Sequence, residues 1–178
     1  MKSLYAFTQR ALRAALLFLL LGVAGMANAQ TLFTVDNLKY SINEDGESVT
    51  VVVHADGQNA TGSLIIPDSV LIEDSYYTVT AIGDGAFFNH QNLSGSLRLP
   101  NSLTSIGDNA FRSCSGFTGN LTIPNSVTSI GYNAFGSCSG FNGCLTLGSS
   151  VTSIGGYAFA LCFHFSSIYS YAFNPPAL

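Results

Sequence analysis

Three of the four cysteines recur at one fixed spacing. Cys114, Cys138 and Cys162 are evenly spaced along the chain, whereas Cys144 stands outside this series. Zinc sites commonly use paired Cys-x-x-Cys ligands, and this pattern does not occur here. If the period stacks the three cysteines on neighbouring coils, about 4.8 Å separates them, more than the Cβ spacing of about 3.8 Å that a disulfide prefers. We therefore expect unpaired thiols that fill buried apolar space.

The other residues with chemical potential form no catalytic or metal-binding pattern. His54, His90 and His164 fall in separate parts of the sequence, with no serine or cysteine nucleophile motif beside them. Asp84 and Asp108 have the same spacing as the cysteines and follow a glycine, but the series does not continue in the next two units, which favours a solvated corner over a calcium ladder. The sequence therefore predicts no enzyme, no catalytic, cofactor-binding or metal-binding residues, and no cofactor.

The 24-residue period is the dominant feature of the chain. "LRLPNSLTSIGDNAFRSC" at residues 97–114 is followed by "LTIPNSVTSIGYNAFGSC" at 121–138 and "LTLGSSVTSIGGYAFALC" at 145–162. A fixed period of this size is typical of a solenoid, in which each coil buries its apolar face against the next. We expect residues 63–178 to form the repeats, with a degenerate last unit after residue 162.

The first unit carries an insertion of nine residues around "LIEDSYYT". Such insertions usually become loops on one face of a solenoid, so we expect a surface loop that carries Glu73, Asp74, Tyr76 and Tyr77.

Alternation within the unit predicts two short strands. The "LxL" positions should point inward, and "TSIG" should form the second strand, followed by a glycine at a sharp corner. "NAFxxC" should form a tight helical or turn segment that buries its alanine and phenylalanine. The outward rows are then Arg98, Thr122 and Thr146 on the first strand, and Ser105, Ser129 and Ser153 on the second.

The segment before the repeats differs from them. In residues 30–62, the runs 40–42 and 48–53 read as two strands joined by the turn-forming residues 43–46. Because a solenoid exposes the apolar end of its first coil, we expect this antiparallel hairpin to be an N-terminal cap.

Residues 1–29 have the layout of a secretory signal peptide. Basic residues precede the apolar run 14–21, and Ala27-Asn28-Ala29 provides small residues at a cleavage site. The apolar run is shorter than the roughly 20 residues of a spanning helix, which disfavours a membrane anchor. Without this leader, three basic residues remain against ten acidic ones, a formal net charge of −7. This charge argues against nucleic acid and, after signal cleavage, against insertion into or binding to an anionic membrane.

The unit "LxLPNSLTSIGxNAFxxC" behind an export signal resembles the bacterial surface leucine-rich repeats of the BspA-like type, which also occur in spirochaetes and trichomonads. The resemblance covers residue 63 to the C-terminus, and "VDNLKYSI" is similar to the segment before these repeats in Bacteroidetes proteins. It implies a mainly β fold, a short right-handed leucine-rich-repeat solenoid with an N-terminal β-hairpin cap, and a secreted or cell-surface location. Family members are associated with adhesion to host matrix proteins and with coaggregation of microbes.

Two hypotheses for the function remain open. The first is an adhesin-like, non-enzymatic binding module that contacts an extracellular protein or glycan on host or microbial cells. The second is a structural spacer or scaffold unit that self-associates through its C-terminal coil. The candidate binding surface combines outward side chains with possible aromatic anchors: Tyr76, Tyr77, Arg98, Thr122, Thr146, Tyr132 and Tyr157.

Overall fold

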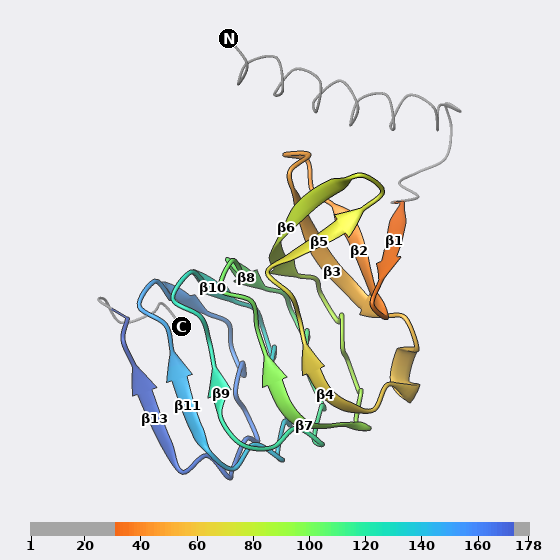
Figure 1. The fold of residues 1–178 in the computed structure, drawn as a ribbon. Helices are drawn as coiled ribbons and strands as arrows, with labels where there is room; N and C mark the ends of the chain where they lie inside the picture. The colour runs from red at the N-terminus through yellow and green to blue at the C-terminus, as the bar shows by residue number, and fades with distance from the viewer. Residues whose placement is uncertain (1–30, 173–178) are drawn as a thin grey trace.

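The computed structural model describes residues 31–172 (Figure 1). The leader predicted at residues 1–29 and the final residues 173–178 lie outside this range. Within it the chain is built from strands and turns, with one short 3-10 turn, η1 (Gly57–Asn59), and no helix long and apolar enough to cross a membrane. This confirms the predicted mainly β fold.

The strands are short and occur throughout the described range. They are β1 (Leu32–Val35), β2 (Leu38–Ile42), β3 (Ser48–His54), β4 (Gly62–Ile65), β5 (Ser69–Ile72), β6 (Ser75–Ile82), β7 (Leu93–Arg98), β8 (Ser105–Ile106), β9 (Leu121–Thr122), β10 (Ser129–Ile130), β11 (Cys144–Leu147), β12 (Ser153–Ile154) and β13 (Ser167–Ser170).

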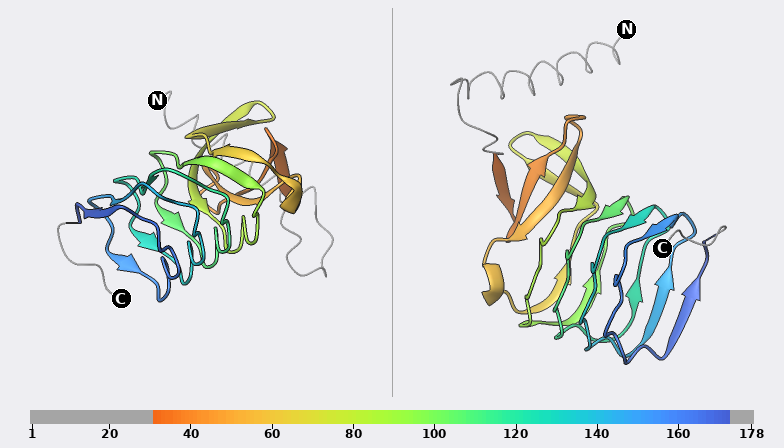
Figure 2. Two further views of the ribbon diagram at one scale, coloured as in Figure 1. Left: turned by 90° about the horizontal axis from the view of Figure 1, so that it is seen from below. Right: turned by 180° about the vertical axis from the view of Figure 1, so that it is seen from behind.

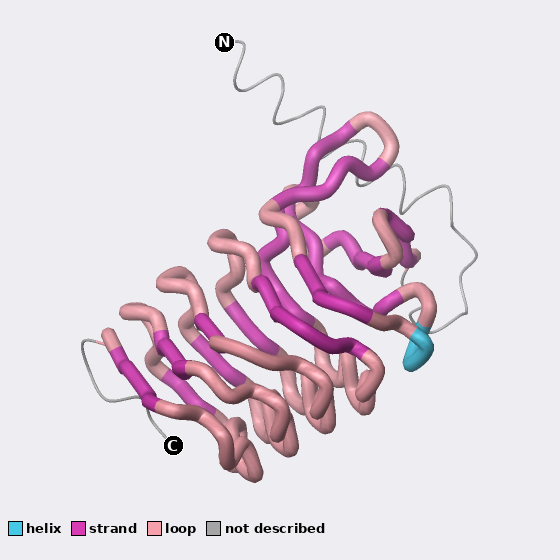
Figure 3. Tube along the Cα trace, turned by 60° about the horizontal axis from the view of Figure 1, so that its bottom comes forward, coloured by secondary structure: helices cyan, strands magenta, loops and turns pink. Residues whose placement is uncertain are grey.

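The repeats stack as successive coils along one axis, as Figure 2 and Figure 3 show. The largest sheet has the order β1-β2-β3-β6-β8-β10-β12, with β5 paired to β6; the other sheets are β13-β11-β9 and β4-β7. Strands of neighbouring coils pair in parallel with equivalent residues opposite each other, as in Ser105, Ser129 and Ser153. The sequence period is thus the structural period, which confirms the predicted solenoid.

The core consists of ladders of identical or similar apolar side chains. The predicted inward positions of the first strand are buried, including Leu64, Leu121 and Ile123. Phe87, Phe111 and Phe135 are fully buried and continue to the partly buried Phe159, with ring centroids 5.0, 5.1 and 5.5 Å apart and nearly parallel ring planes. The spacing of the rings matches the distance between neighbouring strands, so each coil supplies one ring to a continuous stack.

Threonine hydroxyl groups form hydrogen bonds between neighbouring coils. Thr104 donates from both its backbone N–H and its Oγ1 to the carbonyl of Thr80, at 2.8 and 2.9 Å. Thr128 and Thr152 repeat this arrangement one and two coils later. The threonine of "TSIG" therefore satisfies a neighbouring carbonyl twice, which explains why this position is threonine in each of these three units.

The cysteine ladder has a second role, which its spacing in the sequence does not predict. Cys114 and Cys138 are buried, Cys162 is partly buried, and all four cysteines are free thiols. However, each thiol of the ladder also donates to a backbone carbonyl: Sγ to oxygen distances are 2.9 Å from Cys114 to Phe87, 2.9 Å from Cys138 to Phe111 and 3.1 Å from Cys162 to Phe135. In these three coils the position therefore holds a small side chain that also supplies a weak donor.

The glycine after "TSI" is required for a reason other than the one predicted. Gly107, Gly131 and Gly155 do not have positive φ, so they are not needed for an unusual turn. Instead, a Cβ atom at Gly131 would lie 2.6 Å from the backbone nitrogen of Asp108 on the preceding coil. Close approach of the coils, rather than the conformation of the corner, excludes a side chain here.

The "NAF" segments form turns and not helices. The residue at the start of this segment has a left-handed backbone in all four coils, at Gly85, Asn109, Asn133 and Tyr157. Glycine and asparagine tolerate this conformation well, and tyrosine does so at a cost.

The N-terminal cap is larger than the predicted hairpin. β2 and β3 pair in antiparallel fashion as expected, but β1 adds a third strand on the outer side of β2. β3 then pairs in parallel with β6, with Val51 opposite Ile82. The cap therefore continues the large sheet of the solenoid and covers the end of its first coil.

The insertion in the first unit forms a hairpin, so the prediction of a loop is wrong. β5 and β6 pair in antiparallel fashion, with Ile72 opposite Ser75, and Glu73 at the turn has a φ of 53°. Val70 and Ile72 are buried while Leu71 is exposed, which is the alternation of a strand with one buried face. The expectation of a loop rests on the tendency of insertions between repeats to form loops, whereas here the inserted residues continue the alternation of two strands.

We expect Gly131→Ala to destabilise the chain by about 2–3 kcal/mol, because the added methyl group meets backbone atoms that cannot move aside. Gly156→Ala is the matched control, since a Cβ there would lie no closer than 3.7 Å to the ring of Tyr132. Chemical denaturation measures both free energies of unfolding, and equal losses would refute the close-approach explanation.

We expect native chain to react with a thiol-alkylating reagent at Cys144 alone. Burial raises the pKa of Cys114 to about 12 and that of Cys138 well above its usual range, and it also raises the pKa of the partly buried Cys162, so the three thiols of the ladder remain protonated. Hydrogen bonds from Ser167 and Ser166 lower the pKa of Cys144, so its alkylation should rise with pH earlier than that of a free thiol. Mass spectrometry of labelled protein checks this, and Cys144→Ser should abolish native labelling.

Candidate binding surface

A shallow trough crosses the outer face of the large sheet. It has a volume of about 590 Å³ and runs from the cap strand β3 across β6, β8, β10 and β12. Its floor is one register row, in which each residue lies opposite the next on the neighbouring strand: Thr50, Ala81, Ser105, Ser129 and Ser153. The row is straight because every coil repeats the same register.

The floor presents small polar groups to solvent. Ser105, Ser129 and Ser153 make no side-chain hydrogen bond within the part of the chain that the structure describes. The glycines after "TSI" also line the trough, beside this floor. Three evenly spaced hydroxyls are therefore free to donate and accept hydrogen bonds.

Two aspartates lie on the rim, and the carboxylate of each accepts a hydrogen bond from a backbone N–H of the next coil. Asp84 Oδ1 accepts from the N–H of Asp108 at 2.8 Å, and Asp108 Oδ1 accepts from the N–H of Tyr132 at 2.6 Å. The predicted solvated corner is thus also a link between coils. Within residues 31–172, no group of three or more His, Cys, Asp or Glu side chains is placed to hold a metal ion.

Two tyrosines stand at the end of this rim. Tyr132 is 49% exposed and Tyr157 is 68% exposed, and their rings meet edge to face with centroids 5.8 Å apart. An edge-to-face pair holds both rings in place and leaves apolar ring surface in solvent. Tyr132 also lines the trough, so the aromatic pair adjoins the serine floor.

The other predicted binding residues lie elsewhere. Arg98, Thr122 and Thr146 belong to β7, β9 and β11 in the two smaller sheets, with Arg98 and Thr122 exposed and Thr146 half-buried. The seven predicted residues therefore do not form one patch.

The two tyrosines of the inserted hairpin also differ from each other. Tyr76 is exposed, whereas Tyr77 is partly buried against the core. Successive residues of a strand point to opposite faces, so the two side chains do not lie on one surface as they could in a loop. Of the predicted aromatic residues, the structure brings together Tyr132 and Tyr157.

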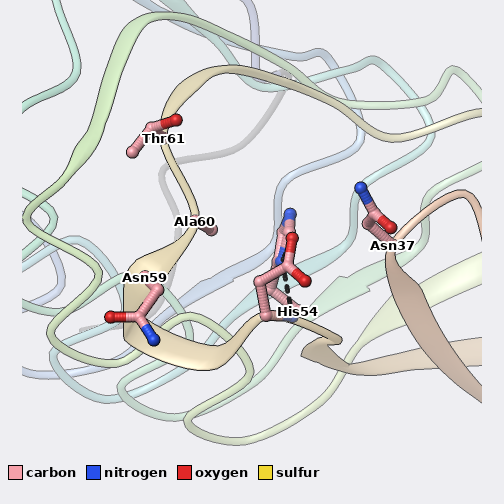
Figure 4. Close-up of a pocket in the computed structure, with 6 residues that line it drawn as sticks. Asn37, His54, Asn59, Ala60 and Thr61 are labelled. Carbon is pink, nitrogen blue, oxygen red and sulfur yellow. Dashed lines mark hydrogen bonds and ion pairs between the residues drawn. The ribbon is translucent and has the colours of Figure 1, made fainter.

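A second hollow lies beside the cap and was not predicted from the sequence. It has a volume of about 450 Å³ and is lined by Asn37, His54, Asp56, Asn59, Ala60 and Thr61 (Figure 4). The backbone N–H of Asp56 donates to His54 Nδ1 at 3.2 Å, and burial lowers the pKa of His54. The imidazole is therefore neutral near pH 7 and serves to close the turn after β3.

The stacked coils, with a short strand, a proline or glycine stop and a tight buried turn in each, define a leucine-rich repeat solenoid. The model of one family, the BspA type leucine rich repeat region, matches residues 69–174 in six copies. The chain belongs to this family, as its repeat motif suggested.

Solved structures of similar fold support the same conclusion. A leucine-rich repeat protein from Bacteroides capillosus has a TM-score of 0.65 and 25% identity, with 79% of this chain and 99% of that chain covered. A leucine-rich repeat protein of T. pallidum has a TM-score of 0.56 and 22% identity, with 78% and 71% covered. One from Bacteroides ovatus has a TM-score of 0.56 and 25% identity, with 77% and 40% covered. No protein of curated function matches the chain.

We expect Asp108→Ala to destabilise the chain by about 1 kcal/mol, because the N–H of Tyr132 loses its partner. Asp108→Asn retains an oxygen acceptor at the same place and should cost less. Thermal unfolding of the two variants measures both losses of stability. If the charge of Asp108 matters rather than its oxygen acceptor, the two variants should lose the same amount.

Proposed function

We propose that this chain is a secreted or cell-surface binding module without catalytic activity, which contacts an extracellular protein or glycan through the trough. The single observation that carries this proposal is the row of three free serine hydroxyls on successive coils, Ser105, Ser129 and Ser153, next to an exposed aromatic pair. The leader pattern of residues 1–29 and the membership in a family typical of bacterial surface proteins support the location.

The chemistry of the trough fits an uncharged, extended ligand. Its floor offers hydroxyls but no charged side chain, and the carboxylates of Asp84 and Asp108 on its rim are engaged by backbone N–H groups. Such a surface recognises groups that both donate and accept hydrogen bonds, such as sugar hydroxyls or the backbone of an extended peptide. The faces of Tyr132 and Tyr157 provide apolar contact for a sugar ring or an aliphatic side chain.

Affinity in this arrangement comes from many shallow contacts. The trough crosses five strands, so a ligand that extends along it meets an equivalent hydroxyl on each of three successive coils. Because the hydroxyls are already positioned by the stack, binding requires little ordering of the protein.

The test is binding of purified chain to arrays of glycans and of extracellular matrix proteins. Ser129→Lys places a long side chain in the centre of the floor, and we expect it to weaken binding at least tenfold, about 1.4 kcal/mol. Thr122→Lys is the matched control, because it adds the same charge at an exposed strand position in another sheet. We expect the control to bind like the unchanged chain.

Two results would contradict the proposal. In one, the chain binds none of the glycans or proteins. In the other, binding occurs and both lysine variants lose it equally, which would place the contact away from the trough or make it a matter of net charge.

A further inference from the structure

The last described coil differs from the others in the side chains that it exposes. Five large apolar residues, each more than half exposed, gather on it: Leu161, Phe163, Ile168, Tyr169 and Tyr171. Exposed apolar residues that occur singly are normal in soluble proteins, but several large ones on a single coil indicate an interaction surface.

Two of these residues replace serines of the preceding coils. Leu161 occupies the position of Ser113 and Ser137, and Phe163 that of Ser115 and Ser139. Leu161 also keeps the left-handed backbone of this position, with a φ of 61°. This backbone conformation is energetically costly for leucine, and an exposed leucine side chain does not offset that cost by burial within the single chain.

Strand edges are open on the same coil. Among the described strands, β13 pairs only with β11, and β12 pairs only with β10. Ile168 lies opposite Leu145 in the register, so it is the last described rung of a core ladder, and no described strand lies on its outer side. Soluble proteins usually guard such edges with lysine, proline or a bulge, and the "SIYS" sequence of β13 has no such residue.

The part of the sequence that forms the last described coils carries no formal charge. The last charged residue in the sequence is Arg112, and residues 113–178 contain no Asp, Glu, Lys or Arg. Residues 30–112 hold ten acidic and three basic residues, a formal net charge of −7. Two copies that meet through their last coils keep these acidic halves at opposite ends, whereas other approaches bring acidic surfaces together.

We propose that a second copy of this chain docks on the last coil, edge to edge along β13 in a two-fold arrangement, with Leu161, Phe163, Ile168 and Tyr169 in the interface. A two-fold axis pairs the same uncharged, apolar face with itself, and antiparallel pairing of two β13 strands satisfies backbone groups that no described strand pairs within one copy. The first coil offers no such partner, because its end is covered by the acidic cap. This surface is separate from the serine floor of the trough. A failure of the dimer proposal therefore leaves the proposed ligand binding untouched, and the reverse also holds.

Sedimentation equilibrium of the purified chain over a range of concentrations tests the proposal. We expect a reversible monomer–dimer equilibrium that high salt does not weaken, since the interface holds no charge. Tyr169→Lys should raise the dimer dissociation constant at least tenfold, because it brings two cations to the pairing strands. Ile65→Lys is the matched control and should leave the equilibrium unchanged, since Ile65 is the exposed residue of β4 in the same outward row.

A second variant distinguishes the loss of the dimer interface from unfolding of the last described coil. The double change Leu161→Ser and Phe163→Ser restores the serines of earlier coils, so it should leave the thermal midpoint equal or higher and still weaken the dimer. A monomer at all concentrations would overturn the proposal, and so would assemblies larger than a dimer, which require an unlike, head-to-tail contact. Equal weakening by Ile65→Lys would also overturn it.

Discussion

The structure depends on the return of the chain to the same register in every repeat. The stack of Phe87, Phe111, Phe135 and Phe159 is the clearest expression of this constraint, because rings about 5 Å apart must come from coils about 5 Å apart. Once the coils are this close, the remaining positions have little freedom. The corner glycines, the donating cysteines and the doubly bonded threonines all follow from the spacing of the coils.

The same constraint generates the surface. A strand position that points outward in one coil points outward in all of them, so any outward residue type becomes a straight row. Ser105, Ser129 and Ser153 become the floor of a trough in this way, and the cap extends the row because Thr50 of β3 joins in register. Where the last coil abandons the pattern, as at Leu161 and Phe163, the surface changes from polar to apolar within the distance of one coil.

The sequence predicts the repeating part of this molecule well because repetition amplifies a weak signal. Leu121 or Phe135 alone says little, but the recurrence of each residue type once per repeat predicts an inward ladder, and both are fully buried. The parts that occur once are harder to predict. β1 and the hairpin of β5 and β6 have no internal copy to compare with, and the general tendency of insertions to form loops does not predict a hairpin here.

The binding surface and the roles of the glycines could not be predicted from the sequence, for a different reason. A sequence ladder shows which residues share a face, but not how closely two backbones approach or whether a row lies at the bottom of a hollow. The sequence suggests a turn residue at Gly131, whereas the structure shows a close approach to the backbone of the preceding coil. The predicted binding surface likewise combines residues that lie on several faces. Tyr132 and Tyr157 were the exception, because their separation is close to one repeat and places them one coil apart at the same corner.

The direction of the hydrogen bonds between coils has a mechanical consequence. Bonds such as that from Gly131 N–H to the carbonyl of Ile106 join one coil to the next, so they run along the axis of the stack. A pull along this axis passes through every junction between coils in series, and the weakest junction opens first. A pull across the strands is shared by all coils at once, and the molecule should resist it much better.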